Sequence, residues 1–215
     1  MTTSPIFRPL LMLVATVAAC TDDAAVPASC NAAGNNPATA FQVADRVCTD
    51  SGLIEGTAGT DPAVTIFRGI PYAAPPIGDL RWKAPQPVVP WTDVRMAKTF
   101  GNNAMQTTPA PHEWWTEEFT PRPELGVDED CLTLNVWTDK TSTNGKRPVL
   151  IFIHGGGFAV GAGSCPAYDG EALARKGVVV VTVNYRLGIF GFLAHPALTA
   201  ESAQQPTRPT QENLQ

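Results

Sequence analysis

The sequence contains no apolar stretch long enough to cross a bilayer and no cluster of basic residues. Its most apolar segment, residues 10–19, is far shorter than the roughly 20 residues that a membrane-spanning helix requires. Acidic residues outnumber basic ones by 20 to 15, which gives a formal net charge of −5. Because nucleic-acid binding depends on basic surfaces, we expect no nucleic-acid partner. No residue pattern indicates a metal or a cofactor, so we expect neither.

The composition indicates a folded domain with many loops. Hydrophobic residues make up 44% of the 215 residues, which is enough for the core of one ordinary domain. The 18 glycines and 20 prolines concentrate between the apolar runs. We therefore expect a loop-rich protein built around a sheet.

The first 19 residues have the pattern of a signal peptide. Arg8 supplies the positive start, and residues 10–19 supply the apolar stretch that ends in small residues. The end of this segment with Cys20 resembles a bacterial lipoprotein signal, in which the cysteine carries lipid. The alternative is an ordinary secretory signal with Cys20 incidental. Either reading predicts export, as a membrane-anchored lipoprotein of the periplasm or cell surface or as a secreted protein.

Composition divides the rest of the chain into three parts. Residues 20–47 are polar and predict a flexible linker, residues 48–202 carry the apolar runs of a domain, and residues 203–215 predict a disordered tail. Export permits disulfides, and four further cysteines allow three pairings that sequence does not distinguish. Proximity in sequence favours Cys30–Cys48 over pairings with Cys131 or Cys165.

The chain is organised around one strand and the glycines after it. Val149–Ile153 is an unbroken apolar run, which predicts a strand of a parallel sheet that is covered on both faces. Gly155, Gly156 and Gly157 follow His154 directly. Backbone N–H groups without side chains in the way can converge on one oxygen, as in an oxyanion hole. A flexible turn is the alternative, and we expect His154 to order the loop rather than act as a base.

Flanking patterns predict an α/β arrangement. Residues 132–136 alternate apolar and polar positions, as in a strand. Residues 169–177 predict a helix with Asp169 as N-cap, and residues 178–183 predict another buried strand. Residues 71–90 hold six prolines and predict an ordered irregular segment. Trp114 and Trp115 either line a ligand gorge or pack under a long loop.

Four segments, in this order, resemble type-B carboxylesterases, the cholinesterase-like branch of the α/β-hydrolases. They are Phe67-Arg68-Gly69-Ile70-Pro71-Tyr72-Ala73 with Leu80-Arg81-Trp82, then Glu129-Asp130-Cys131-Leu132-Thr133-Leu134-Asn135-Val136-Trp137, the strand and glycines up to Phe158, and Asn184-Tyr185-Arg186-Leu187-Gly188-Ile189-Phe190-Gly191-Phe192-Leu193. The resemblance covers about residues 50–202. It implies the N-terminal part of an α/β-hydrolase fold, with a mixed, mostly parallel sheet that is incomplete.

The resemblance also implies roles for individual residues. Gly156 and Gly157 would donate N–H groups to the oxyanion, and Gly155 and Phe158 would border the substrate. Arg81 and Glu129 match an ion pair that ties the proline-rich segment to the following strand.

Two further positions match family residues whose usual partners are not evident in this sequence. Arg186 matches an arginine that pairs with an acid further down the chain. Cys131 matches a disulfide cysteine whose usual partner is here Ala104, so we expect Cys131 to be free and buried.

The sequence contains no G-x-S-x-G motif, so no triad serine, acid or histidine is assigned. We expect an N-terminal fragment of a carboxylic ester hydrolase that acts on small esters, is inactive alone, and is insoluble or loosely folded because the apolar strand at 149–153 has a bare edge. The alternatives are a non-catalytic binding module and a functionless truncation or frameshift product.

Overall fold

A computed structural model describes residues 45–107, 116–141 and 146–203. The predicted signal peptide, Cys20, Cys30, most of the linker, Trp114, Trp115 and the tail from residue 204 lie outside the described residues. Within them, the first element begins at residue 46, two residues before the predicted start of the domain.

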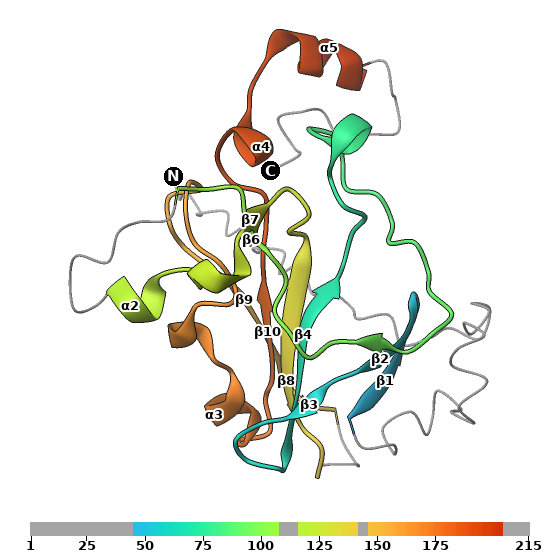
Figure 1. The fold of residues 1–215 in the computed structure, drawn as a ribbon, viewed down its shortest axis with the longest axis vertical. Helices are drawn as coiled ribbons and strands as arrows, with labels where there is room; N and C mark the ends of the chain where they lie inside the picture. The colour runs from blue at the N-terminus through green and yellow to red at the C-terminus, as the bar shows by residue number, and fades with distance from the viewer. Residues whose placement is uncertain (1–44, 108–115, 142–145, 204–215) are drawn as a thin grey trace, which may run out of the picture.

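A five-stranded mixed sheet forms the centre of the molecule (Figure 1). Its order is β3-β4-β8-β10-β9. The strands are β3 (Thr57–Ala58), β4 (Val64–Pro71), β8 (Thr133–Asp139), β10 (Val179–Val183) and β9 (Val149–Ile153). The mixed sheet agrees with the prediction, but only the β9–β10 pair in it is parallel. The chain between β9 and β10 contains a short helix, and a crossover of this kind is the usual connection between neighbouring parallel strands.

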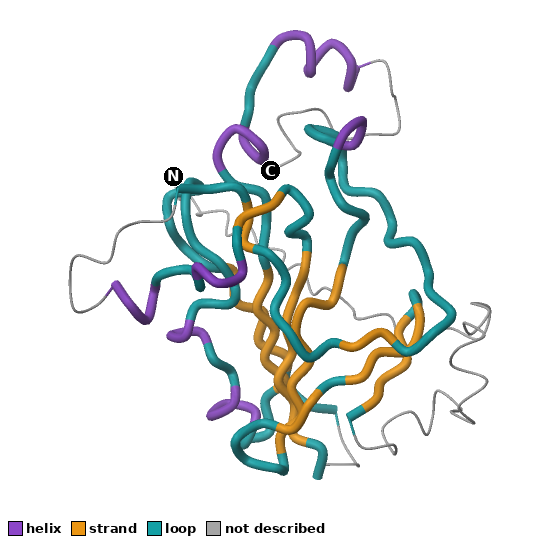
Figure 2. Tube along the Cα trace, in the orientation of Figure 1, coloured by secondary structure: helices purple, strands orange, loops and turns teal. Residues whose placement is uncertain are grey.

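Two smaller sheets and short helices surround the central sheet (Figure 2). The small sheets contain β1 (Arg46–Thr49), β2 (Gly52–Glu55) and β5 (Arg95–Met96), and β6 (Asn103–Ala104) with β7 (Val127–Asp128). The helices are α2 (Thr116–Phe119), α3 (Glu171–Ala174), α4 (Gly188–Phe192) and α5 (Pro196–Ala203), with 3₁₀ turns at Gly78–Leu80, Pro123–Leu125 and Pro166–Tyr168. The proline-rich segment is otherwise irregular, as predicted. No helix in the described ranges is long and apolar enough to cross a membrane.

The main core lies between the sheet and α3. It contains Val64, Ile66, Trp137, Ala174 and Val180, each at most 3% exposed. Burying such side chains contributes about 1.5–3 kcal/mol each for the larger ones. This core therefore fixes β4, β8 and β10, the strands that carry the candidate site at their ends.

The polar side of β8 is buried rather than solvated. Asn135 is 3% exposed, and its Oδ1 accepts a hydrogen bond from the Gly69 amide at 3.0 Å. Its Nδ2 donates to Thr182 Oγ1 on β10, which in turn donates to the Gly163 carbonyl. Gly69 lies at the irregularity in the β4–β8 pairing, where the ladder leaves a backbone group to be satisfied. The strand predicted from the alternation is confirmed. Its polar residue Asn135 links β8 through hydrogen bonds to β4 and β10.

The expectation that β9 is covered on both faces is wrong. β9 lies at the edge of the sheet, and Val149, Leu150, Ile151 and Ile153 are 43–67% exposed. β9 is the last strand of the sheet: β10 pairs with one of its edges, and no described strand pairs with the other. The exposed edge expected for this strand is thus present in the part of the chain that the structure describes.

Two helix predictions also need correction. The helix predicted over residues 169–177 spans only Glu171–Ala174, and its N-cap is Gly170 rather than Asp169. Asp169 still accepts a hydrogen bond from the Glu171 amide, at 2.9 Å. α4 lies in a segment where no helix was predicted, and its first residue, Gly188, has a φ of +54°.

Candidate active-site loop

The glycine loop, residues 154–161, follows directly on the end of β9. Its backbone has positive φ at three successive residues, with +121° at Gly156, +61° at Gly157 and +60° at Phe158. Positive φ costs a glycine little, but it is strained for a bulky aromatic residue. A local constraint must therefore hold Phe158, and such strain often accompanies a functional loop.

The amides of Gly156 and Gly157 donate no hydrogen bond to any described residue. Both residues are exposed, and a Cβ built on Gly155 or Gly157 would meet no atom within 4 Å. A Cβ on Gly156 would instead lie 1.9 Å from the Val160 carbonyl oxygen. The predicted oxyanion donors are thus exposed. At Gly156 the close Val160 carbonyl leaves no room for a side chain, so this position requires glycine.

Three contacts hold the loop to the rest of the protein. Tyr185 donates from its hydroxyl to the His154 carbonyl at 2.7 Å. The Gly188 amide donates to the Phe158 carbonyl at 2.8 Å, and the Phe158 ring packs on Phe192 with centroids 4.7 Å apart. These last two contacts supply the constraint that Phe158 needs at positive φ.

A fourth contact joins the far end of the loop to a distant segment. The Gln106 side chain donates from Nε2 to the Gly161 carbonyl at 2.9 Å and accepts from the Gly161 amide at 2.8 Å. Gly161 is packed tightly, since a Cβ there would lie 2.4 Å from His154 Nδ1. The sequence offered no signal for this pair, which is 55 residues apart.

His154 is placed to order the loop rather than to exchange protons. It is 3% exposed, and burial lowers the pKa of its imidazole. Its Nδ1 lies 2.8 Å from the Gly155 carbonyl, so Nδ1 carries the proton, and its ring stacks on Tyr185. Nε2 is buried without a hydrogen-bond partner in the described part of the chain.

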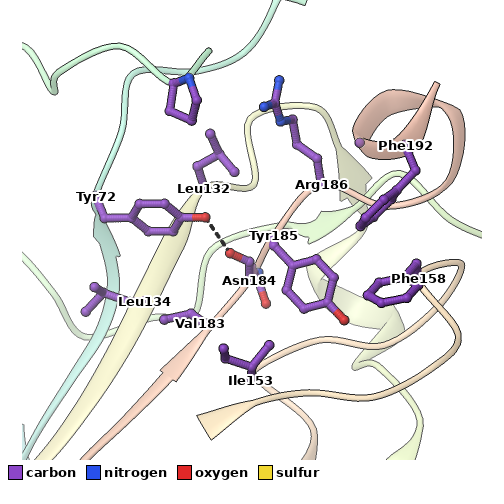
Figure 3. Close-up of a pocket in the computed structure, with 12 residues that line it drawn as sticks. Tyr72, Leu132, Leu134, Ile153, Phe158, Val183, Asn184, Tyr185, Arg186 and Phe192 are labelled. Carbon is purple, nitrogen blue, oxygen red and sulfur yellow. Dashed lines mark hydrogen bonds between the residues drawn. The ribbon is translucent and has the colours of Figure 1, made fainter. Parts of the chain in front are cut away.

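A cavity of about 680 Å³ lies beside the ends of the loop and of β10 (Figure 3). Figure 3 shows Phe158 and Phe192 on one side of it and Tyr72, Leu132 and Leu134 on the other. The lining residues are Tyr72, Pro85, Leu132, Leu134, Ile153, Phe158, Val183, Asn184, Tyr185, Arg186, Gly191 and Phe192. The wall is mostly apolar, and Ile153 and Phe158 flank the glycine triplet in sequence. The cavity is therefore lined by residues on both sides of the candidate oxyanion donors in sequence.

Arg186 contributes the cationic group of this wall. Its Nη1 donates to the Lys83 carbonyl at 2.9 Å, and burial lowers its pKa. No carboxylate forms an ion pair with it among the described residues. Tyr72 lies nearby, where burial raises its pKa to about 12, and its hydroxyl donates to the Asn184 carbonyl (Figure 3).

Arg81 and Glu129 form the ion pair that the sequence predicted. The guanidinium Nε and Nη2 each lie 2.5 Å from a different carboxylate oxygen. The hydrogen bond to Glu129 is the main cause that raises the pKa of Arg81. This two-point contact joins the proline-rich segment to the start of β8, near α4.

The cysteines differ in environment. Cys131 and Cys165 are free and buried, as expected for Cys131, which packs with Ala104 in a small core. Burial raises the pKa of Cys131 to about 12. Cys48 is disulfide-bonded, and its partner lies outside the described residues.

Ser164 is not placed as a nucleophile. It is 3% exposed, and its hydroxyl donates to Asn103 Oδ1 at 3.3 Å. No group of three or more His, Cys, Asp or Glu residues within the described ranges could hold a metal ion.

The sequence model of the carboxylesterase family matches residues 44–202. Fumonisin B1 esterase of Sphingopyxis macrogoltabida is 49% identical over 155 residues, which are 72% of this chain and 26% of that protein. Phenmedipham hydrolase of Pseudarthrobacter oxydans is 47% identical over 136 residues, 60% of this chain and 26% of that protein. Para-nitrobenzyl esterase of Bacillus subtilis is 45% identical over 148 residues, 68% and 28% of the two chains. The chain spans about a quarter of the length of these relatives.

Proposed function

The chain belongs to the carboxylesterase family, and we propose that it supplies the oxyanion-binding loop and part of the acyl-site wall of a carboxylic ester hydrolase. The proposal rests chiefly on the amides of Gly156 and Gly157, which make no hydrogen bond to a described residue. The next residue in the chain, Phe158, lines the apolar cavity. The esterases among its relatives support ester hydrolysis as the reaction class.

The proposed chemistry is acyl transfer through a tetrahedral intermediate. A serine attacks the ester carbonyl, the alcohol leaves, and water releases the acyl group from the enzyme. The two glycine amides donate to the oxygen that becomes negative when the serine attacks. Each such donor typically contributes about 10²–10³ in kcat. The sequence holds no G-x-S-x-G motif, so we propose that the 215 residues alone do not turn over esters.

The cavity suggests which part of the ester this chain contacts. Its wall is formed by aliphatic and aromatic side chains next to Phe158, and Phe158 is 61% exposed. Most of this lining is apolar, so an apolar acyl chain can be buried against it without leaving a polar group unpaired, and Arg186 is the one charged side chain among the lining residues. We propose small apolar esters as the substrate class.

A chimaera tests the proposal. Residues 44–202 are joined to the part of Fumonisin B1 esterase that follows its matched region, and hydrolysis of p-nitrophenyl butyrate is measured. Gly157→Ala adds a methyl group at one of the two proposed donors, at a φ of +61° and in space that holds no other atom within 4 Å. We expect kcat to fall by about 10²-fold.

Gly126→Ala is the matched control, since Gly126 has a φ of +66° and equally empty space at Cβ. An equal loss of kcat in both variants would rule against the oxyanion role. If the chimaera is active and Gly157→Ala does not lower its kcat, the loop is only a structural turn and not an oxyanion hole. Turnover by the unmodified 215-residue chain, surviving further purification, would refute its proposed inactivity.

The cellular location is a separate proposal, based on sequence alone. We propose export and lipid attachment at Cys20. Cells that express the chain or its Cys20→Ser variant are fractionated. We expect the substitution to move the protein from the membrane fraction to the soluble exported fraction. Unchanged fractionation would favour an ordinary secretory signal.

A further inference from the structure

The glycine loop closes upon itself at Gly161. The Gly156 carbonyl accepts from the amides of Ala159 and Val160 at 3.1 and 3.2 Å, so the chain turns back directly after the bare amides. A Cβ on Gly161 would lie 2.6 Å from the Gly155 carbonyl oxygen. The start and the end of the loop are therefore in van der Waals contact, and a movement of one displaces the other.

Gln106 is the side chain that fixes this closing point. Its amide pairs with both backbone groups of Gly161, as a neighbouring strand would, and Nε2 also donates to the Ala104 carbonyl at 3.0 Å. Ala104 belongs to β6 and is 2% exposed, so the side chain of Gln106 is anchored on a buried strand. The two long-range bonds cross 55 residues of sequence and hold the end of the loop at Gly161, whereas Tyr185 holds its start at His154.

We propose that Gln106 is a positioning residue that sets the direction of the Gly156 and Gly157 amides by clamping Gly161 against His154 and Gly155. The role builds on the proposed oxyanion function of these amides, and Gln106 acts only through the backbone. A side-chain amide suits this task because one planar group supplies a donor and an acceptor at fixed spacing. A carboxylate keeps the acceptor and loses the donor, which leaves an oxygen facing the Gly161 carbonyl.

The test uses the complete 215-residue chain labelled with ¹⁵N-glycine, whose 18 glycines give a spectrum simple enough to assign. In Gln106→Glu at neutral pH we expect exchange of the Gly161 amide to rise about tenfold or more. We also expect the Gly156 and Gly157 cross-peaks to shift and broaden. Protonating the new carboxyl at lower pH restores a donor, so the cross-peaks should return toward their wild-type positions at that pH.

Gln86→Glu is the matched control. Gln86 is also half-buried, and its Nε2 also donates to the carbonyl two residues back, Ala84, at 2.8 Å. It makes no side-chain bond to a distant segment among the described residues. This variant should leave the loop glycines unchanged.

Three results would overturn the proposal: Gly161 changing alone in Gln106→Glu, equal effects in both variants, or a wild-type Gly161 amide that exchanges as fast as in an unstructured peptide. If Gln106→Glu unfolds, Gln106→Asn replaces it in the test, because Asn keeps the amide donor and acceptor on a shorter side chain. The proposal then requires that Gln106→Asn shift the same cross-peaks while the chain stays folded. No ester is present in these measurements. Failure of the clamp is therefore distinguishable from failure of the ester hydrolase proposal, which the chimaera tests.

Discussion

Tyr185 holds His154 in two ways: its hydroxyl donates to the His154 carbonyl at 2.7 Å, and its ring stacks on the imidazole at 4.4 Å and 17°. The pair joins the second residue after β10 to the first residue after β9. The positions at the ends of two adjacent parallel strands are thereby locked, and the glycine loop starts from a fixed point. A mobile start would spread the amides of Gly156 and Gly157 over many directions, which is costly for a charge-binding site.

The buried imidazole predicts a pH-dependent stability. Burial lowers the pKa of His154, so the unfolded chain binds the proton more tightly than the folded chain does. The free energy of unfolding should therefore be highest above the unfolded pKa of about 6.5 and fall as the pH decreases below it. Urea denaturation between pH 7.5 and 5 should show a weaker decrease in His154→Gln. The exposed His195, replaced in the same way, should leave the decrease as it is in the wild type.

The buried hydrogen bonds of Asn135 predict that its replacement lowers the stability of the folded chain. Asn135→Ala leaves the Gly69 amide and Thr182 without their partner. We expect the free energy of unfolding to fall by about 2–3 kcal/mol. Urea denaturation should show almost no effect for Asn102→Ala, because Asn102 is exposed and its side chain makes one long contact of 3.5 Å. Equal effects of the two substitutions would contradict this account of β8.

The exposed edge at β9 predicts self-association. Five apolar residues with open backbone groups and no charge form a template for a second strand, most directly β9 of another copy. Ile151→Lys should raise the monomer fraction in sedimentation velocity and reduce turbidity on concentration. Val89→Lys adds the same charge at a position that is 78% exposed, away from the sheet. If both lysines solubilise the chain equally, net charge rather than the strand edge controls association.

The thiol of Cys131 should resist alkylation in the folded chain. With a pKa of about 12, only roughly one thiol in 10⁴ is ionised at pH 8, and the thiolate is the reactive form. Iodoacetamide followed by peptide mass mapping should label Cys131 in urea far faster than in buffer. Rapid labelling in buffer would mean that the core around Ala104 opens frequently, as expected of a loosely folded chain.

Local patterns in the sequence identified three strands of the central sheet and the main loop. An apolar run predicts a strand wherever it lies, so β9, β10 and the alternating β8 were all evident. Three consecutive glycines after a strand indicated exposed backbone, and the structure places Gly155, Gly156 and Gly157 in an exposed loop after β9. The Arg81–Glu129 pair was found through resemblance to the family, since 48 residues separate the two.

Contacts that depend on chain path were not evident. The apolar composition of Val149–Ile153 suggested two covered faces, because composition records what a strand prefers and not what packs on it. The burial of Asn135 was not predicted, because an alternating pattern does not distinguish a polar residue that faces solvent from one with a buried hydrogen-bond partner. Gln106 carried no signal, because an amide side chain is ordinary in a loop.

The sequence by itself determined where backbone is bare and where strands form, since both follow from residue type and spacing within a few positions. Only the tertiary structure decided that β9 is an edge, that Tyr185 and Gln106 hold the two ends of the glycine loop, and that the cavity adjoins it. These properties arise from bringing together segments tens of residues apart. That arrangement is set by the core of β4, β8 and β10, and no local pattern encodes it.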